Sequence, residues 1–309
     1  MKETYNLAFW GTGRIAATVI DTISHIDRLK KYACASRSIE KSNTFAEKYN
    51  VEKALSFEEL LLDANVDLIY ISTPTKLHYE HIKKCLLAGK NVICEKPMVE
   101  TEEEAIELVQ IAKNKQCLLI DGLWTMYMPI IGTLEEAIKQ IGLIKYASAG
   151  LGYPSINRSA TGITSTYELW DYEIYPLSIM HALFGPPDKI VSRTKIQYSM
   201  PVKNVSFLMY RGRKCRIFSS LKRRGTYCFF ALGTKGLILC RKYWMGKYPV
   251  FVWKYPFSIK KHVMTHKYSG YEYEFEAAID CLDHTEIQSE VYPLKRTIAI
   301  MKSKKSMYE

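Results

Sequence analysis

A glycine-rich turn near the start of the chain constrains its fold more than any other segment. The turn follows an apolar run at residues 5–10, opens a helical pattern, and reads Gly11-Thr12-Gly13-Arg14-Ile15-Ala16. In such a strand–turn–helix, the first glycine permits the tight turn, the second lets the backbone approach a pyrophosphate, and the small alanine permits close packing of helix on strand. The motif therefore predicts a Rossmann dinucleotide-binding domain in which residues 11–15 contact the cofactor.

The sequence after this turn alternates short apolar runs with helical patterns as far as residue 120. Strands are expected at 5–10, 32–35, 66–72, 91–94 and 117–120, and helices at 14–26, 39–49, 57–62, 79–88 and 102–114. Strands that alternate with helices imply a parallel sheet with helices on both faces. We place this Rossmann domain at residues 1–122.

The pattern changes after Pro129. A helix at 132–140 leads into runs separated by turn signals, at 144–149, 189–198, 205–210, 215–221, 227–232 and 236–239. Such spacing is typical of antiparallel strands, so the predicted fold class is α/β with a second, α+β domain built on an open, mostly antiparallel sheet. This domain, residues 123–309, is expected to bind substrate and to oligomerise. Helices are expected at 271–282 and 295–302, and the C-terminal one is a candidate to pack back on the first domain.

Length and composition support two globular domains. The 309 residues exceed the roughly 100 to 200 at which one core usually stops growing, and 48% hydrophobic with 24% charged residues is ordinary for a soluble protein. No apolar run approaches the roughly 18 residues of a membrane span, and a signal-peptide pattern is absent, so a cytoplasmic location is expected. The eight cysteines lack CxxC spacing and are predicted to be reduced and mostly buried, and no metal site is expected.

Positive charge is concentrated in the second half of the chain. Residues 1–150 contain 18 Lys and Arg against 20 Asp and Glu, whereas residues 151–309 contain 25 against 12. The stretch 189–271 holds 19 Lys and Arg and no acidic residue. Three interpretations stay open: strands with one solvated face, steering of an anionic substrate, or attraction to nucleic acid or a membrane surface. The third rests on aromatic residues interleaved with cations at 241–244 and 253–255.

The end of the second strand indicates which dinucleotide is bound. An Asp or Glu there would bond the 2′-hydroxyl of NAD, but this strand ends in Ser36 and Arg37, with Lys41 one turn further on. A hydroxyl followed by cations suits the 2′-phosphate of NADP, because a guanidinium forms charge-assisted hydrogen bonds with phosphate oxygens. NADP is therefore favoured over NAD, and the alternative is a solvated helix start that happens to be basic.

Four later segments carry a more specific pattern. They are VDLIYISTPTKLH at 66–78, AGKNVICEKP at 88–97, LWTMYMP at 123–129 and DYEIYPL at 171–177. In order and spacing these segments resemble the Gfo/Idh/MocA family, and within it the dimeric dihydrodiol dehydrogenase and glucose-fructose oxidoreductase branch. The resemblance continues at 233–236, 270–274 and 289–301, so it covers nearly the whole chain. It implies an NAD(P)-dependent oxidoreductase that acts on CH–OH groups.

The resemblance also implies roles for individual residues. Those implied to contact the cofactor are Thr73, Pro74, Leu77, His78, Glu95 and Lys96, and those implied to face the substrate are Lys96, Trp124 and Tyr175. Chemistry supports two of these roles, because reducing a ketone by hydride needs a proton donor, and a phenol with a pKa of about 10 serves near neutrality only beside a cation. Tyr175 is thus the candidate general acid and Lys96 its cation. Asp171 is a candidate to hold a catalytic water, and Arg158 to bind an anionic or hydroxyl-rich substrate.

The chain departs from the pattern of this branch at several positions. Thr166 and Tyr167 replace a glycine pair, Glu173 replaces a glycine, Met126 an arginine and Asp121 a glutamate. Three hypotheses follow. The chain is an oxidoreductase of a sugar, cyclitol, nucleotide sugar or related cyclic diol; a non-catalytic NADP-binding regulatory protein; or a polyanion-binding protein on a Rossmann scaffold. A homodimer or larger assembly is expected, because relatives commonly pair through the open sheet face, which otherwise exposes apolar side chains.

Overall fold

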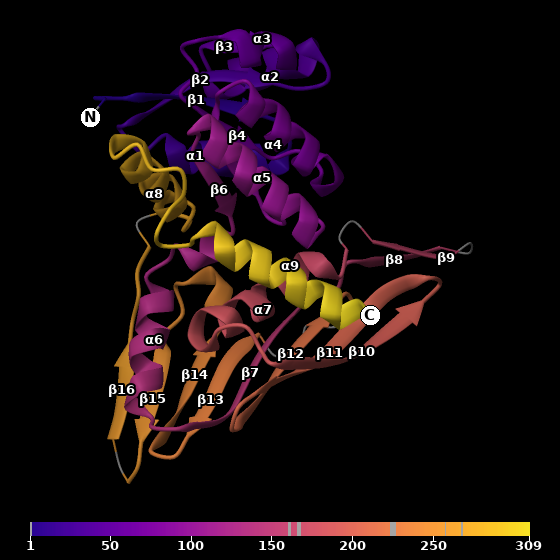
Figure 1. The fold of residues 1–309 in the computed structure, drawn as a ribbon, viewed down its shortest axis with the longest axis vertical. Helices are drawn as coiled ribbons and strands as arrows, with labels where there is room; N and C mark the ends of the chain where they lie inside the picture. Colours follow the sequence, from indigo (N-terminus) through magenta and orange to yellow (C-terminus); the bar gives the residue numbers. More distant parts are fainter. Residues whose placement is uncertain (1, 160–161, 166–167, 223–226, 257, 267) are drawn as a thin grey trace. The chain divides into compact units, whose positions relative to one another are not determined.

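The computed structural model describes the chain except residues 1, 160–161, 166–167, 223–226, 257 and 267. By its contacts the chain forms two units, one of Met1–Tyr127 with Tyr268–Ile298 and one of Met128–Lys267 with Ala299–Glu309. The first unit therefore includes a segment from late in the chain, whereas the sequence suggested a single boundary after residue 122, which stays a prediction. Figure 1 shows the elements of each unit, coloured along the chain.

The first unit is built on a six-stranded parallel sheet with the order β3-β2-β1-β4-β5-β6. Its strands are β1 (Tyr5–Trp10), β2 (Leu29–Ala35), β3 (Lys53–Leu55), β4 (Leu68–Ile71), β5 (Asn91–Glu95) and β6 (Leu119–Gly122). Its helices are α1 (Arg14–Ile23), α2 (Ile39–Tyr49), α3 (Phe57–Leu62), α4 (His78–Leu87), α5 (Glu102–Lys115) and α8 (Glu272–Asp283), with short 3-10 turns η1 (Thr75–Leu77) and η2 (Trp124–Met126). The strand order reverses at β1, which in doubly wound sheets marks the ligand-binding edge.

Local sequence explains where several of these elements begin and end. Serine or threonine N-caps with a glutamate three residues on form the capping boxes Ser56–Glu59 and Thr101–Glu104, which start α3 and α5. Asn50 adopts a left-handed conformation with φ 52° and ends α2. Helix α1 ends at Ile23 instead of residue 26, because the N–H groups of His25 and Ile26 reach carbonyl oxygens only three residues back. The edge strand β3 was not predicted, since three residues are too few to show a period.

The second unit is built on an eight-stranded sheet with the order β10-β11-β12-β7-β13-β14-β15-β16. Its strands are β7 (Ile144–Gly152), β10 (Lys189–Gln197), β11 (Met200–Tyr210), β12 (Arg213–Ser220), β13 (Cys228–Gly233), β14 (Gly236–Arg241), β15 (Val250–Lys254) and β16 (Ser258–His262). Every neighbouring pair is antiparallel except β7 with β12. This confirms a mostly antiparallel second sheet. Strands β8 (Ile156–Ser159) and β9 (Gly162–Ser165) form a separate two-stranded antiparallel sheet.

Helices cover one face of the eight-stranded sheet and leave the other open. Helix α7 (Trp170–Phe184) packs on β7 and β12, and α6 (Ile130–Gln140) on β14 and β15 (Figure 1). Side chains alternate along β11, where Leu208 is fully buried and Phe207 is 41% exposed. The register places Phe207 on the same open face as Val191 of β10 and Arg216 of β12. The open face therefore mixes apolar side chains with cations.

Helix α9 (Leu294–Tyr308) is divided between the units, since its residues up to Ile298 group with the first and those from Ala299 with the second. The eight cysteines are free thiols, buried except for the half-buried Cys228, as the sequence predicted. Within the described ranges, no cluster of three His, Cys, Asp or Glu side chains is arranged to hold a metal ion. No helix in the described part of the chain combines the length and apolar character needed to cross a membrane.

Candidate active site

The glycine-rich turn lies at the carboxyl end of β1 in the first unit. Gly11 has φ +114°, and its N–H donates to the carbonyl oxygen of Ala35 at 2.8 Å, at the end of β2. A Cβ on Gly11 would lie 3.1 Å from the carbonyl carbon of Ser72. The conformation and the space both require glycine here. The predicted turn is thus present at the switch point of the sheet.

Gly13 differs from Gly11 because open space surrounds it. It is the N-cap of α1, and a Cβ there would meet no heavy atom of the described residues within 4 Å. The first turn of α1 contains no acidic residue. Helix N-termini attract anions through their N–H groups and the helix dipole. The N-terminus of α1 therefore fits a pyrophosphate. Thr12, Arg14 and Ile15 are the chain neighbours of Gly13 at this place.

The structure brings the three predicted 2′-phosphate ligands together at the end of β2. The hydroxyl of Ser36 donates to the carbonyl oxygen of Ser38 at 2.7 Å, and the Ser38 side chain caps α2 by accepting from the N–H of Lys41 at 3.5 Å. Arg37 and Lys41 are exposed. Since Ala35 bonds Gly11, these cations lie beside the glycine-rich turn.

A buried histidine joins two turns that follow neighbouring strands. His78 is 1% exposed; its Nε2 lies 2.7 Å from the carbonyl oxygen of Thr73, and its Nδ1 lies 2.8 Å from that of Pro97. Carbonyl oxygens only accept hydrogen bonds, so both contacts are bonds only when both ring nitrogens carry hydrogen. His78 thus ties the turn after β4, which includes Pro74 and Leu77, to the turn after β5.

The hydroxyl of Thr73 contacts a second histidine. Its Oγ1 lies 3.0 Å from Nδ1 of His81. Burial lowers the pKa of His81 to about 4, and the charges of Lys84 and His78 act in the same direction. His81 is therefore neutral at physiological pH and binds the threonine as a neutral imidazole.

Three buried carboxyls gather near Lys96 in the first unit. Glu95 ends β5, and its Oε1 accepts from the hydroxyl of Tyr70 at 2.6 Å and its Oε2 from the N–H of Lys96 at 3.1 Å. Asp121 accepts from the hydroxyl of Thr297 at 2.7 Å. Glu274 of α8 is fully buried, and neither of its oxygens has a hydrogen-bond partner among the described residues.

Burial makes ionisation of this carboxyl cluster costly. It raises the pKa of Asp121 to about 7, and burial together with the charges of Glu95 and Asp121 raises the pKa of Glu274 well above its usual value. Burial also raises the pKa of Glu95, but bonds from Tyr70 and Lys96 and the charge of Lys96 oppose this. Of the three carboxyls, Glu95 is the one whose charged form is favoured by a neighbouring cation, Lys96. Sequence reasoning did not single out Glu274, because only the fold brings it to this strand edge.

An aromatic ring packs against Trp124, the predicted substrate-pocket residue of the first unit. Trp124 lies in η2 and is half-buried, and its ring stacks on that of Tyr271 with centroids 4.9 Å apart and an interplanar angle of 21°. Met126, which stands where the branch has arginine, is 3% exposed. One face of the Trp124 ring is thus covered by Tyr271, while the Met126 side chain belongs to the core.

In the second unit, helix α7 carries two of the predicted catalytic residues. Asp171 and Tyr175 are one turn apart and both half-buried, and Oδ2 of Asp171 accepts from the N–H of Glu168 at 2.9 Å. The backbone of Arg158 lies in β8, paired with Ile163, and its side chain is outside the described part. Two departures from the branch pattern, at residues 166 and 167, also lie outside the described residues.

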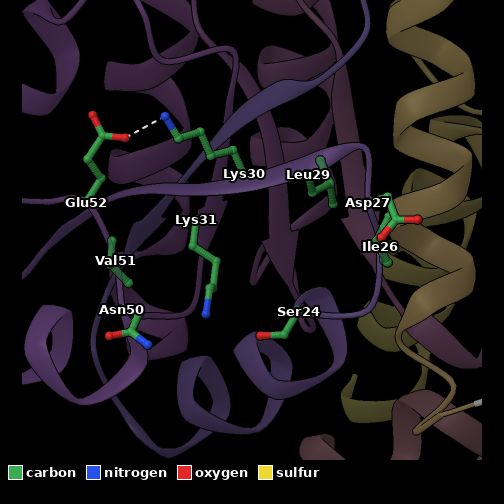
Figure 2. A pocket seen from close by; sticks show the side chains of 9 residues that line it. All are labelled: Ser24, Ile26, Asp27, Leu29, Lys30, Lys31, Asn50, Val51 and Glu52. Atoms are coloured by element: carbon green, nitrogen blue, oxygen red, sulfur yellow. Dashed lines mark ion pairs between the residues drawn. The ribbon is translucent and has the colours of Figure 1, made fainter.

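A hollow of about 550 Å³ opens elsewhere on the first unit (Figure 2). It is lined by Ser24, Ile26, Asp27, Leu29, Lys30, Lys31, Asn50, Val51 and Glu52. Lys30 and Glu52, two of these residues, form an ion pair at 2.6 Å. Leu29 and Lys30 lie at the start of β2, roughly 20 Å of strand from Ser36 at about 3.3 Å per residue. The hollow is therefore separate from the glycine-rich turn, and we assign it no role.

The fold and the turn define a dinucleotide-binding protein, and comparisons with known proteins agree. Residues 5–123 match the model of an oxidoreductase family with an NAD-binding Rossmann fold. Trans-1,2-dihydrobenzene-1,2-diol dehydrogenase of Mus musculus is 32% identical over 225 residues, which are 69% of this chain and 66% of the mouse enzyme. The enzyme of that name from Xenopus laevis is 28% identical over 263 residues, 79% of this chain and 76% of the relative.

Solved structures share the fold over almost the whole chain. A 3-ketoreductase from Actinomadura kijaniata, in complex with TDP-benzene and NADP, superposes with a TM-score of 0.85 at 17% identity, covering 99% of this chain and 97% of that one. Levoglucosan dehydrogenase, in complex with NADH and levoglucosan, gives 0.84 at 15% identity over 99% and 96%. The chain belongs to the Gfo/Idh/MocA family of oxidoreductases. The predicted family, fold class and oxidoreductase class are thereby confirmed.

Proposed function

We propose that this chain is an NADP(H)-dependent oxidoreductase that transfers a hydride to or from a secondary alcohol or ketone on a sugar, cyclitol, nucleotide sugar or related cyclic diol. The observation that carries the proposal is the cradle at the ends of β1 and β2. Gly13 leaves the N-terminus of α1 open, and Arg37 and Lys41 are exposed beside it. The relatives act on or bind such molecules by their names, which supports the substrate class.

The proposed choice of NADP over NAD depends on the end of β2. No acidic side chain stands at the position that would bond a 2′-hydroxyl; Ser36 and Arg37 stand there instead. A guanidinium matches a phosphate with charge-assisted hydrogen bonds, each worth roughly 1.5 to 3 kcal/mol. Thr73, Pro74, Leu77 and His78 would border the rest of the cofactor.

The proposed proton chemistry assigns one task to each catalytic residue. Bound NADP would supply or accept the hydride. The hydroxyl of Tyr175 donates a proton to the carbonyl oxygen when a ketone is reduced, and its phenolate takes that proton back when an alcohol is oxidised. The ammonium of Lys96 stabilises the phenolate. If Tyr175 does not donate the proton, a water held by Asp171 is the alternative source. Trp124 and Arg158 bind the substrate.

The carboxylate of Glu95 supports the proposed task of Lys96. It accepts from the backbone N–H of Lys96, and its charge lies close to the lysine side chain. A negative group beside an ammonium favours the protonated lysine. We therefore propose that Glu95 supports Lys96 as the cation beside Tyr175.

We also propose that the chain forms a homodimer through the open face of the eight-stranded sheet. That face exposes Val191 and Phe207 and leaves Trp253 half-buried. Apolar area of this kind is more stable when covered by a partner. A cytoplasmic location stays a prediction from the sequence.

Tyr175→Phe tests the proposed function, because it keeps the ring and deletes only the hydroxyl. With NADP and a panel of sugars, cyclitols and cyclic diols, kcat should fall by roughly 10² to 10⁴ while NADP affinity stays within a factor of about three. Tyr198→Phe, at an exposed tyrosine of the same unit, is the matched control and should leave both unchanged. Full turnover by Tyr175→Phe would remove Tyr175 from the mechanism. Tight NADP binding without turnover by the wild type would favour the regulatory protein.

A further inference from the structure

A buried acid fastens the last turn of α9 to α7. Glu173, in the first turn of α7, is 1% exposed, and its carboxylate accepts a hydrogen bond from the hydroxyl of Tyr308. A hydrogen bond with the side chain of Asn204, from β11, reaches the same carboxyl. The Tyr308 ring is 42% exposed, whereas its hydroxyl is turned inward. Two helices and a strand of the second unit therefore meet at Glu173.

Further contacts hold the same end of α9. The ammonium of Lys304 lies 5.0 Å from the ring centroid of Trp170, the first residue of α7. Nε2 of His181, near the end of α7, lies 3.0 Å from Oγ of Ser303, and both side chains are buried. Contacts at both ends of α7 thus come from one face of α9, whose members are Ile300, Met301, Ser303, Lys304, Met307 and Tyr308.

The fastened helix is the one that carries Asp171 and Tyr175. These residues are four apart, so they share a face of α7. Glu173 is two residues from each, which places it about 200° around the helix from either one. A side chain anchored on the far face fixes the rotation of the helix about its axis. The position of the Tyr175 side chain then depends on the contacts of Glu173, on the opposite face of the helix from the proposed chemistry.

We propose that Glu173 is a positioning residue and that Tyr308 is its anchor, so that the pair sets the rotation of α7 and the place of the Tyr175 hydroxyl. The effect on turnover rests on the proposed function. The carboxyl is costly to leave without its donor: burial raises its pKa to about 7, against hydrogen bonds from Tyr308 and Asn204 and the charge of Lys304, which lower it. A buried acceptor that loses its donor costs more than the bond itself contributed.

Amide hydrogen exchange of the α7 peptides tests the inference directly. Tyr308→Phe keeps the ring and deletes the hydroxyl, and exchange in α7 should become about 10- to 100-fold faster. Ser306→Ala, which removes an exposed hydroxyl from the same turn, is the matched control and should change nothing. The double variant Glu173→Met with Tyr308→Phe replaces both polar partners by apolar groups, so protection should return to within about threefold of the wild type.

Turnover provides the second measurement. In Tyr308→Phe, kcat per folded site should fall by about 10-fold with an unchanged KM for NADP, and it should recover in the double variant. An α7 whose exchange is unchanged in Tyr308→Phe overturns the inference, as does a double variant no better protected than the single one. If the wild type turns over no alcohol or ketone, the proposed function fails, while exchange still decides whether Tyr308 anchors α7.

Discussion

Replacing Asp121 by asparagine tests whether burial raises the pKa of this carboxyl in the folded chain. Burial raises the pKa of Asp121 from 3.8 to about 7. Above pH 4 the unfolded chain loses a proton that the folded state retains, so this group's contribution to stability is complete only at low pH and is lost as the pH rises to 7. At about 1.4 kcal/mol per pKa unit, the wild type should lose about 3 kcal/mol of unfolding free energy between pH 5 and pH 8 through this group.

Urea denaturation at these two pH values measures the effect. Asparagine does not titrate, so the unfolding free energy of Asp121→Asn minus that of the wild type should rise by about 3 kcal/mol from pH 5 to pH 8. The new amide group adds a cost of roughly 1 to 3 kcal/mol if it finds no partner, but that cost is the same at every pH. Glu47→Gln, at an exposed carboxyl of the same unit, should show no such slope. A difference that is constant with pH would refute the reasoning.

Three further predictions concern the cofactor and the assembly. Gly13→Ala should weaken NADP binding at an unchanged Tm, whereas Gly122→Ala should cost about 1 to 3 kcal/mol of stability, because its Cβ would lie 2.7 Å from the carbonyl oxygen of Cys94. Calorimetry measures NADP binding and thermal melts measure Tm, and equal losses of Tm in the two variants would contradict this prediction. Arg37→Asp should weaken NADP by about 10- to 100-fold and NAD far less in fluorescence titrations, and equal losses would point to another phosphate ligand. The dimer dissociation constant from sedimentation should fall by about 10-fold between low and high salt, because screening relieves repulsion between two cationic faces; a monomer at micromolar concentration would remove the dimer.

The nucleotide-binding edge could be predicted from the sequence because its signals are local. Gly11 and Gly13 report a turn between a strand and a helix, and Ser36 and Arg37 stand at a fixed place after the next strand. The residues that surround Lys96 could not be predicted in this way. Their contacts join segments from β4, β6 and α8, which are far apart in the chain. In addition, the periodic pattern of apolar residues in the sequence does not indicate which buried acid keeps its proton.

The origin of the basic stretch becomes clearer once the strand register is known. None of the eight strands in the second sheet contains an Asp or Glu. On β10 to β12, Arg193, Lys203 and Arg216 lie on the open face, interleaved with Val205 and apolar neighbours. The alternation is therefore that of strands with one uncovered face, the first of the three interpretations. The same face still provides a positive field that would act on an anionic substrate or on a second copy of the chain.

The departures from the branch pattern that the structure describes have a common physical meaning. Met126, Glu173 and Asp121 are 3%, 1% and 2% exposed. All three side chains therefore belong to the packed interior of their units, next to the elements that carry the proposed catalytic residues. Glu173 places a carboxylate where the branch has glycine, and this carboxylate accepts a hydrogen bond from Tyr308. Asp121 keeps the carboxyl of the branch's glutamate on a shorter side chain, and burial raises its pKa to about 7. The hypothesis of a regulatory protein rested on the glycines that this chain replaces. Of these replacements the structure describes Glu173, whose side chain lies on the face of α7 opposite Tyr175. The expected consequence of this replacement is altered stability and pH dependence, with hydride chemistry retained.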